Sequence, residues 1–180
     1  MAQIRIRNTN ERIGDEQKVR QFLEGQEVLY EHWDTRKLPA QLQEKFVLSD
    51  ADKTEVLATF DADIKELSAR RGYKTWDLIT LSDATPNLDE LLIKFEAIHT
   101  HTEDEIRAIT AGKGIFIIKG AGDMGYFDVE LSAGDVISVP ENTAHFFTLM
   151  DNRAIVAVRL FIEPNGWIAE PYEDPSFVQA

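Results

Sequence analysis

The sequence predicts a mainly β fold in which an N-terminal helical third packs on a β-barrel. Three observations support this prediction. Short apolar runs follow one another from Phe95 to about residue 162, glycines separate these runs, and one long amphipathic segment, 50–71, has helical spacing. Short strands at close, regular spacing are typical of sandwiches and barrels.

The chain is expected to form a single domain. Its 180 residues, 43% of them hydrophobic, suffice for one sizeable core and are few for two. No internal repeat, low-complexity tract or linker divides the sequence. We expect a helical portion, a barrel core and a tail, over residues 1–72, 73–170 and 171–180 respectively.

Composition excludes several classes of partner. The formal net charge of -13 repels nucleic acid phosphates and anionic lipid, so neither nucleic acid nor a membrane is an expected partner. The chain has no cysteine, which fits a reducing compartment, and it shows neither a secretory signal nor an apolar run long enough to span a membrane. We therefore expect a soluble cytoplasmic protein. The absence of a self-association stripe favours a monomer.

The helical third begins with three short elements. Isoleucines that alternate with arginines from Ile4 onward predict a strand, and residues 14–24 predict a helix that Asp15 can cap. Residues 28–33 predict a second strand. This strand contains His32, which stands alone in an aromatic setting and is expected to be a packing or surface residue rather than a ligand.

The clearest helix is expected over 50–71. Ser49 or Asp50 can cap its start, Gly72 can end it, and its apolar residues recur at helical spacing. The chain then continues with a strand, a turn-rich break and a short helical turn, over 76–81, 83–87 and 88–93. The barrel strands are expected over 95–101, 105–110, 114–119, 126–131, 135–139, 144–149 and 154–162.

Two histidines in the first of these strands predict a metal site. His99 and His101 lie two residues apart, so a strand directs both side chains to the same face, and Glu105 follows four residues later. Two imidazoles and a carboxylate suit iron, nickel, manganese or zinc. His145 follows a turn after Pro140 and is the best candidate for a third imidazole. Four protein ligands would leave two positions of an octahedron for substrate.

Both parts of this ligand set resemble the two motifs of the cupin superfamily, whose members are small β-barrels that hold a metal inside. In this chain they read His99-x-His101-x3-Glu105-x6-Gly112 and Gly134-x5-Pro140-x4-His145. Asn142 stands where the superfamily usually has glycine, and Leu149 where it often has asparagine. Asparagine can adopt the left-handed conformation that such a turn demands, so we expect the first difference to be mild.

The resemblance narrows to the acireductone dioxygenase family and covers the chain closely from about Gly72 to Ala169. The combination of H-T-H-x-E-D-E-I-R with a later G-W-I-A is specific. The family often has tryptophan where this chain has Phe146. The similar segments are 72–77, 94–95, 99–107, 135–140, 145–147, 159–161 and 166–169.

This resemblance implies a metal-dependent dioxygenase of methionine salvage. The implied substrates are dioxygen and the acireductone 1,2-dihydroxy-3-keto-5-methylthiopentene. With iron the implied products are formate and 2-keto-4-methylthiobutyrate, and with nickel they are formate, carbon monoxide and 3-methylthiopropionate. The implied cofactor is one Fe²⁺ or Ni²⁺ per chain, with His99, His101, Glu105 and His145 as its ligands.

Two arginines are candidates for holding the anionic substrate. Arg107 shares strand parity with Glu105 and should point into the barrel, while Ile106 and Ala108 point to the other face. Arg159 lies within an apolar run, where burying its charge is costly unless the charge is paired. Each arginine can hold the substrate or orient Glu105. For both, an outward-facing surface position is the alternative.

Three further residues are site candidates. Asp104 lies beside the ligand set and can accept a substrate proton, or it can be a solvated turn residue. Phe95 can form an apolar wall and Trp167 can lie over the methylthio tail, although both residue types are more often plain core residues.

Two alternative functions stay open for a metal-binding cupin. A sugar-phosphate isomerase would be expected to carry more basic residues for phosphate than the net charge of -13 suggests. A non-enzymatic sensor of a small ligand usually carries a basic DNA-binding unit, and the N-terminal third has no such charge cluster.

Overall fold

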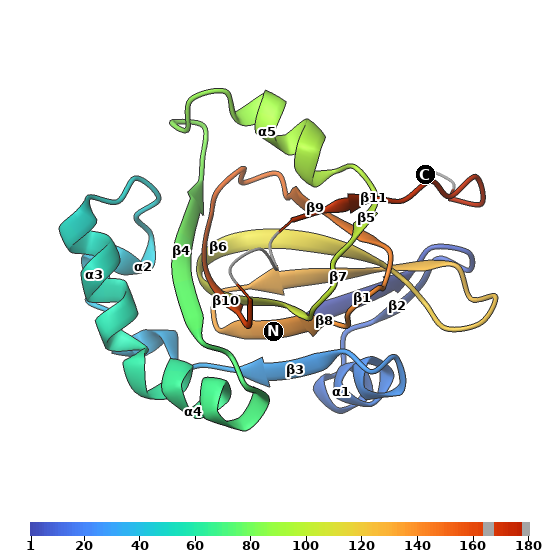
Figure 1. Cartoon of the computed structure of the whole chain (residues 1–180), viewed down its shortest axis with the longest axis horizontal. Coiled ribbons are helices and arrows are strands. Elements are labelled where there is room, and N and C mark those ends of the chain that lie inside the picture. Colours follow the sequence, from blue (N-terminus) through green and yellow to red (C-terminus); the bar gives the residue numbers. More distant parts are fainter. Residues whose placement is uncertain (164–167, 178–180) are drawn as a thin grey trace.

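The structure, a computed structural model, describes residues 1–163 and 168–177. A barrel of antiparallel strands occupies the centre, and helices lie around it (Figure 1). The expected mainly β architecture, a cupin-type barrel with N-terminal helices, is confirmed. Among the described residues, no helix is long and apolar enough to cross a membrane.

The elements follow one another in the order in which Figure 1 labels them. They are β1 (Gln3–Ile6), β2 (Glu11–Ile13), α1 (Glu16–Gly25), β3 (Leu29–His32), the 3-10 turn η1 (Thr35–Lys37), α2 (Ala40–Gln43), α3 (Asp50–Thr59), α4 (Asp61–Arg71), β4 (Thr75–Leu81), α5 (Leu88–Phe95), β5 (His99–Thr100), β6 (Glu105–Lys119), β7 (Tyr126–Ser132), β8 (Asp135–Val139), β9 (His145–Leu149), β10 (Ile155–Phe161) and β11 (Glu170–Pro171).

Strand β6 belongs to both walls of the barrel. Its first part pairs with β8 and β10, and its second part pairs with β7 and β9. The prediction of two separate strands over 105–110 and 114–119 is wrong, because Gly112 takes a φ of 79° within the continuous strand. A Cβ at this position would lie 2.1 Å from the Ala154 carbonyl oxygen, so only glycine fits the close approach of β10.

Helices α3 and α4 cover the outer face of the wall that contains β10 and the start of β6 (Figure 1). The prediction of one helix over 50–71 is wrong. The chain bends at Phe60, which is fully buried and stacks on Trp33 with ring centroids 5.5 Å apart, so both short helices turn their apolar sides to the sheet. The predicted ends are confirmed, since Ser49 forms a capping box and Gly72 ends α4 with a φ of 84°.

The predicted strand over 95–101 is also wrong. Phe95 ends α5, whose apolar residues recur at helical spacing and pack on the barrel, and only His99 and Thr100 are in a strand. The short apolar run of this segment fits both the helical period of 3.6 residues and the strand period of 2. The segment forms a helix because the helix buries Leu88 and Leu92. The remaining predicted strands agree with β1, β3, β4 and β7 to β10 within a few residues. The sequence did not predict β2, η1, α2 or β11.

Candidate metal centre

The structure brings the four sequence-predicted ligands together inside the barrel. His99 and His101 come from β5 and the residue after it, Glu105 begins β6, and His145 begins β9. One ligand atom from each residue lies within 4.8 Å of the others. His99, His101 and His145 are 8%, 6% and 1% exposed as whole residues, and the Glu105 side chain is 9% exposed, so water competes little for these ligands.

A backbone carbonyl fixes the tautomer of each imidazole. His99 Nδ1 lies 2.7 Å from the Ala97 oxygen, and His145 Nδ1 lies 2.7 Å from the Thr143 oxygen. His101 Nδ1 lies 2.9 Å from the oxygen of Ile168, which is distant in sequence. A carbonyl can only accept, so each Nδ1 carries the proton and each Nε2 presents a lone pair to a metal.

The inner atoms of the site fit a cation. The Glu105 carboxylate lies 2.5 Å from His145 Nε2 and 2.9 Å from His101 Nε2. In the neutral tautomers set by the carbonyls, these contacts bring lone pairs against lone pairs, which a positive ion between them would relieve. Three imidazole nitrogens and one carboxylate therefore form a buried site whose donor set suits a divalent transition metal.

Burial and neighbouring charges favour the protonation states of His99 and Glu105 that can bind a metal. Burial and, to a smaller extent, the neighbouring His145 lower the pKa of His99 to about 4, so the His99 imidazole stays neutral. Burial opposes ionisation of Glu105, but Arg107 and the two histidines together hold its pKa well below the ordinary value. The carboxylate is therefore ionised and available to a metal.

Arg107 points into the barrel, as its parity predicted. Its Nη2 lies 2.8 Å from Glu105 Oε1, and its Nη1 donates to the Ile106 carbonyl at 2.9 Å. Ile106 and Ala108 face α3 and α4 on the other side of the sheet. Burial lowers the pKa of Arg107, and the charge of Glu105 counteracts this effect. The guanidinium thus orients the carboxylate and leaves positive charge beside the site.

A small, mostly apolar cavity of about 30 Å³ adjoins Glu105 and Arg107. Phe95 lies in its wall, at the end of α5, with its ring 6.3 Å from that of Phe147. The other residues of the wall are Ile79, Leu81, Ile109, Phe116, Ile155 and Ala157. The space next to the charged groups is therefore lined mainly by apolar side chains and suits an apolar group.

Arg159 lies next to Arg107 across the sheet but binds a different partner. Arg107, Arg159 and Asp77 are register neighbours on β6, β10 and β4. Both oxygens of Asp77 accept from the Arg159 guanidinium, at 2.8 Å and 2.6 Å, and the Arg159 side chain is 22% exposed. The charge in this apolar run is thus paired at the rim of the barrel.

The two acidic residues between the ligands turn away from them. The Asp104 carboxylate accepts from Arg71, at the end of α4, and from the Glu141 backbone N–H at 3.2 Å. The buried Glu103 carboxylate accepts from the backbone N–H groups of Ile162 and Glu163 at 3.0 and 3.1 Å. Glu103 thus fixes the chain where β10 ends, a role the sequence did not predict because both partners lie about 60 residues away.

Three other positions carry predictions from the sequence, namely Trp167, His32 and Asn142. Trp167 lies outside the described residues. His32 is exposed on β3, which agrees with a surface position. At the turn before His145, Asn142 has a φ of 57°, which confirms that asparagine adopts the left-handed conformation there.

Comparisons with known proteins show which family this chain belongs to. The model of the ARD/ARD' family matches residues 3–169. The acireductone dioxygenase of Geobacillus kaustophilus (strain HTA426) is 66% identical over 97% of both chains, and that of Geobacillus thermodenitrificans (strain NG80-2) is 63% identical over the whole of both. A solved acireductone dioxygenase from Bacillus anthracis, with a cadmium ion in its active centre, superposes with a TM-score of 0.91 at 54% identity and covers 94% of this chain and 97% of its own. This chain therefore belongs to the ARD/ARD' family of acireductone dioxygenases.

Proposed function

We propose that this chain is a metal-dependent dioxygenase that cleaves the acireductone 1,2-dihydroxy-3-keto-5-methylthiopentene with O2 in methionine salvage. The observation that carries the proposal is the buried set of three Nε2 lone pairs and one carboxylate, next to a guanidinium and an apolar cavity. The similarity to the acireductone dioxygenases, over nearly the whole of both chains, supports the substrate.

His99, His101, Glu105 and His145 would hold the ion, which supplies Lewis acidity and positions for substrate oxygens when it is bound. Arg107 and the apolar wall of the cavity supply further effects. Arg107 keeps Glu105 ionised and adds positive charge beside an enediolate. The apolar wall with Phe95 excludes water and receives the methylthio end of the substrate.

The proposed roles of the remaining candidates follow from their positions. Arg159 attracts the anionic substrate from the rim of the barrel, where Asp77 holds its guanidinium. Asp104 braces the loop between the ligands through Arg71 and the Glu141 N–H, and we do not retain it as the residue that accepts a substrate proton.

The native ion is proposed to be Fe²⁺ or Ni²⁺, one per chain. The donor set of imidazoles and one carboxylate accepts either, and the Irving–Williams order favours nickel whenever it is available. The iron form is proposed to yield formate and 2-keto-4-methylthiobutyrate. The nickel form is proposed to yield formate, carbon monoxide and 3-methylthiopropionate.

Reconstitution tests both parts of the proposal. Metal-free protein is loaded separately with Fe²⁺ and with Ni²⁺, and oxygen uptake is recorded with the acireductone under conditions that suppress its spontaneous oxidation. We expect uptake with both metals and carbon monoxide with nickel only. No enzyme-dependent uptake with either metal would remove the proposed activity, whereas uptake with the same products from both would remove only the metal-dependent outcome.

We also propose that the chain acts as a cytoplasmic monomer. Within residues 1–163 and 168–177, the large apolar side chains that are exposed are few and come from four segments of the chain. They are Met1, Val47, Ile93, and Ile168 with Tyr172. Sedimentation velocity of the metal-loaded protein tests the oligomeric state, and a dimer at micromolar concentration would contradict it.

A further inference from the structure

The strand that carries His99 and leads directly to His101 is one of the shortest in the barrel. β5 consists of His99 and Thr100, and it meets β9 through the single register pair of His99 and His145. The loop after it adds one backbone–backbone bond, from the Asn142 N–H to the His101 carbonyl at 2.8 Å, and the side-chain bonds of Glu103 and Asp104 fix its later part. A segment with so few backbone hydrogen bonds of its own is poorly fixed. Metal ligands, however, need a fixed orientation.

A second set of contacts to β5 and His101 comes from residues 168–177, here called the strap. The Ile168 carbonyl accepts from His101 Nδ1 at 2.9 Å. Next along the strap, β11 pairs with β5, so that Pro171 lies opposite His99, and the Tyr172 N–H donates to the Ile98 carbonyl at 3.1 Å. The strap thus fixes the imidazole of one ligand and the backbone of another.

Asp174 anchors the far end of the strap to β6 and β7, and its contacts with Lys119 and Tyr126 are here called the lock. Its carboxylate accepts from Tyr126 Oη at 2.9 Å and from Lys119 Nζ at 3.0 Å, and its side chain is only 6% exposed. Lys119 and Tyr126 are register partners at the ends of β6 and β7, so the lock joins the strap to the most extensively paired hairpin of the barrel. Phe177 packs edge-on against the Tyr126 ring, 4.8 Å away.

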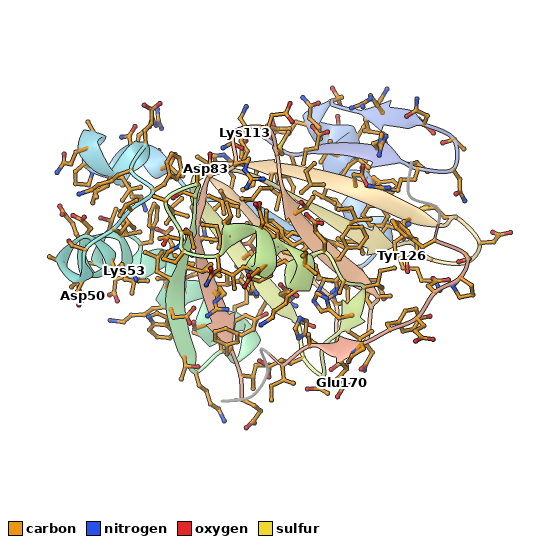
Figure 2. All side chains as sticks on the ribbon, turned by 90° about the horizontal axis from the view of Figure 1, so that it is seen from above. Asp50, Lys53, Asp83, Lys113, Tyr126 and Glu170 are labelled. Carbon is orange, nitrogen blue, oxygen red and sulfur yellow. The ribbon has the colours of Figure 1, made fainter. Side chains whose placement is uncertain are left out.

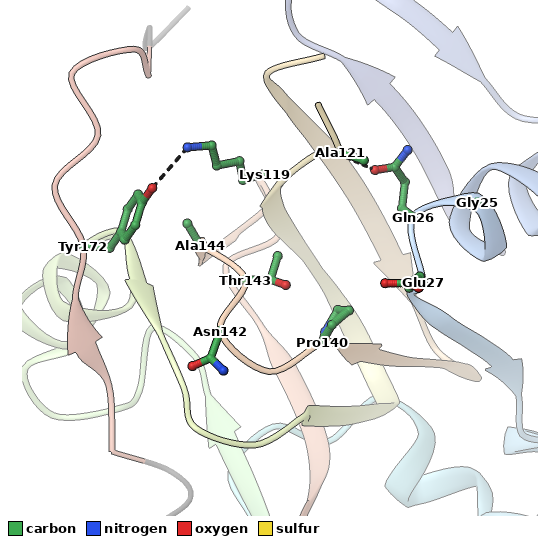
Figure 3. Close-up of a pocket in the computed structure, with 11 residues that line it drawn as sticks. Gly25, Gln26, Glu27, Lys119, Ala121, Pro140, Asn142, Thr143, Ala144 and Tyr172 are labelled. Carbon is green, nitrogen blue, oxygen red and sulfur yellow. Dashed lines mark hydrogen bonds between the residues drawn. The ribbon is translucent and has the colours of Figure 1, made fainter. Parts of the chain in front are cut away.

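The lock and the ligands lie close together along β6 and β9. The Lys119 N–H donates to the carbonyl of Ala144, the residue before His145, and its ammonium donates to Tyr172 Oη at 3.2 Å (Figure 3). Figure 3 shows Lys119 and Tyr172 at one side of an open pocket of about 490 Å³, with Asn142 and Ala144 beside them. The strap, the lock and the turn that leads to His145 are therefore connected through hydrogen bonds.

We infer that Asp174 is a positioning residue for the metal centre, which acts through the strap to hold His101 and β5 in the ligating arrangement. It touches neither metal nor substrate. The inference rests on the proposed function only in requiring a bound metal ion, and it can be tested without turnover. Loss of a partner that orients a ligand imidazole typically weakens metal binding 10- to 100-fold.

The test measures Zn²⁺ affinity by competition with a chelator, using the full chain. Asp174→Ala removes the lock, and Tyr126→Phe removes one hydroxyl while keeping the ring that packs on Phe177. Asp63→Ala is the matched control, because it also removes one carboxylate bound by a lysine, on α4, on the side of the molecule away from the strap (Figure 1). We expect about 10-fold or weaker Zn²⁺ binding in Asp174→Ala, a smaller loss in Tyr126→Phe and none in Asp63→Ala.

The imidazole N–H signals of the zinc-loaded protein separate positioning from general loosening. His99 and His145 donate to local carbonyls two residues away, whereas His101 donates to the strap. We expect solvent exchange of the His101 Nδ1–H to accelerate selectively in Asp174→Ala. Unchanged Zn²⁺ affinity, equal acceleration at all three histidines, or an equal loss in Asp63→Ala would overturn the inference.

If Asp174→Ala does not fold, Tyr126→Phe carries the same criteria. Failure of the inference and failure of the proposed function remain distinct outcomes. A wild-type chain that binds Zn²⁺ tightly but never takes up oxygen with iron or nickel would refute the activity alone. An active wild-type chain whose strap variants bind Zn²⁺ normally would refute the inference alone.

Discussion

The Arg107 guanidinium and the Glu105 carboxylate lie 2.8 Å apart on the same face of β6, directed into the barrel. Their i,i+2 spacing on a strand produces this pairing, because alternate residues share a face. The pair joins a proposed metal ligand to a charge that can receive an anionic substrate. It links the metal centre to the cavity beside it.

Arg107→Met should abolish most of the activity. The substitution keeps an unbranched side chain but removes the charge beside Glu105, so the developing negative charge of the substrate loses its nearest cation. Loss of one such stabilising group typically lowers kcat by about 100-fold or more. Oxygen uptake at matched metal content measures the effect. The activity of Arg107→Lys, which keeps the positive charge but loses the guanidinium, should lie between that of wild type and that of Arg107→Met. Activity of Arg107→Met within threefold of wild type would exclude the proposed role.

Arg159→Gln should have a milder effect that appears mainly in KM. Arg159 is more exposed than Arg107 and is already bound by both oxygens of Asp77. Its loss weakens attraction of the substrate and leaves the orientation of Glu105 intact, so we expect KM to rise by a few-fold to about 10-fold at nearly constant kcat. Steady-state kinetics decides the point. A fall in kcat as large as that of Arg107→Met would show that Arg159 reaches the reacting groups.

His99 should make the metal-free protein sensitive to acid. Its folded pKa is about 4, lowered by burial, against about 6.5 in an unfolded chain. Above pH 6.5 the imidazole is neutral in both states and has no effect. As pH falls from 6.5 to 4, His99 binds a proton in the unfolded chain but stays neutral in the folded chain. The free energy of unfolding therefore falls, by at most about 3 kcal/mol.

The comparison with His99→Asn isolates this effect from the opposite one of His101. Burial is the largest influence on the His101 pKa and lowers it, but the hydrogen bond and charge of Glu105 and the Ile168 carbonyl together raise the pKa above its usual value. Urea unfolding in the presence of a chelator measures both proteins at several pH values. Relative to the variant, wild type should lose stability between pH 6.5 and 4 and no further below. A difference that does not change with pH would contradict the assignment of His99 as a buried neutral group.

Gly114→Ala should force the Phe147 ring to move. A Cβ at Gly114 would lie 2.6 Å from two atoms of that ring and 3.0 Å from Ile155 Cδ1. Overpacking of this kind typically costs about 1–3 kcal/mol of unfolding free energy. Phe147 lines the small cavity, so its displacement should also raise KM for the acireductone.

A second substitution tests whether the contact is the cause. Phe147→Leu in the Gly114→Ala background shortens the side chain and should recover part of the stability, which gives a favourable coupling energy in a double-mutant cycle. Thermal or urea unfolding of the four proteins provides the cycle. Strictly additive effects of the two substitutions would show that the Cβ does not act through Phe147.

Much of the fold follows from local pattern. Glycines between the apolar runs, and the alternation of apolar and polar residues within them, locate β7 to β10. Strand parity alone places Glu105 and Arg107 on the inner face. The errors arise where one local pattern fits two structures. Phe95 belongs to an apolar run that suits either period, and the burial of α5 decides in favour of the helix.

The candidate site was predictable in its ligands but not in its support. His99, His101, Glu105 and His145 are recognisable by residue type, spacing and family resemblance. The Ile168 carbonyl that holds His101 and the backbone groups that hold Glu103 lie about 60 residues away, and backbone partners leave no trace in side-chain identity. Figure 2 shows Tyr126, which donates to Asp174, at the opposite end of the molecule from Asp50 and Lys53 at the start of α3.

The metal content of wild type and His145→Ala tests the central claim most directly. His145 supplies one of four ligands and is almost fully buried at the start of β9, so its loss opens the site without unpairing the strand. After loading with Ni²⁺ and removal of excess metal, wild type should retain one ion per chain. The variant should retain almost none and lose oxygen uptake, while its circular dichroism spectrum stays that of the folded protein. Full occupancy in folded His145→Ala would contradict the four-ligand centre.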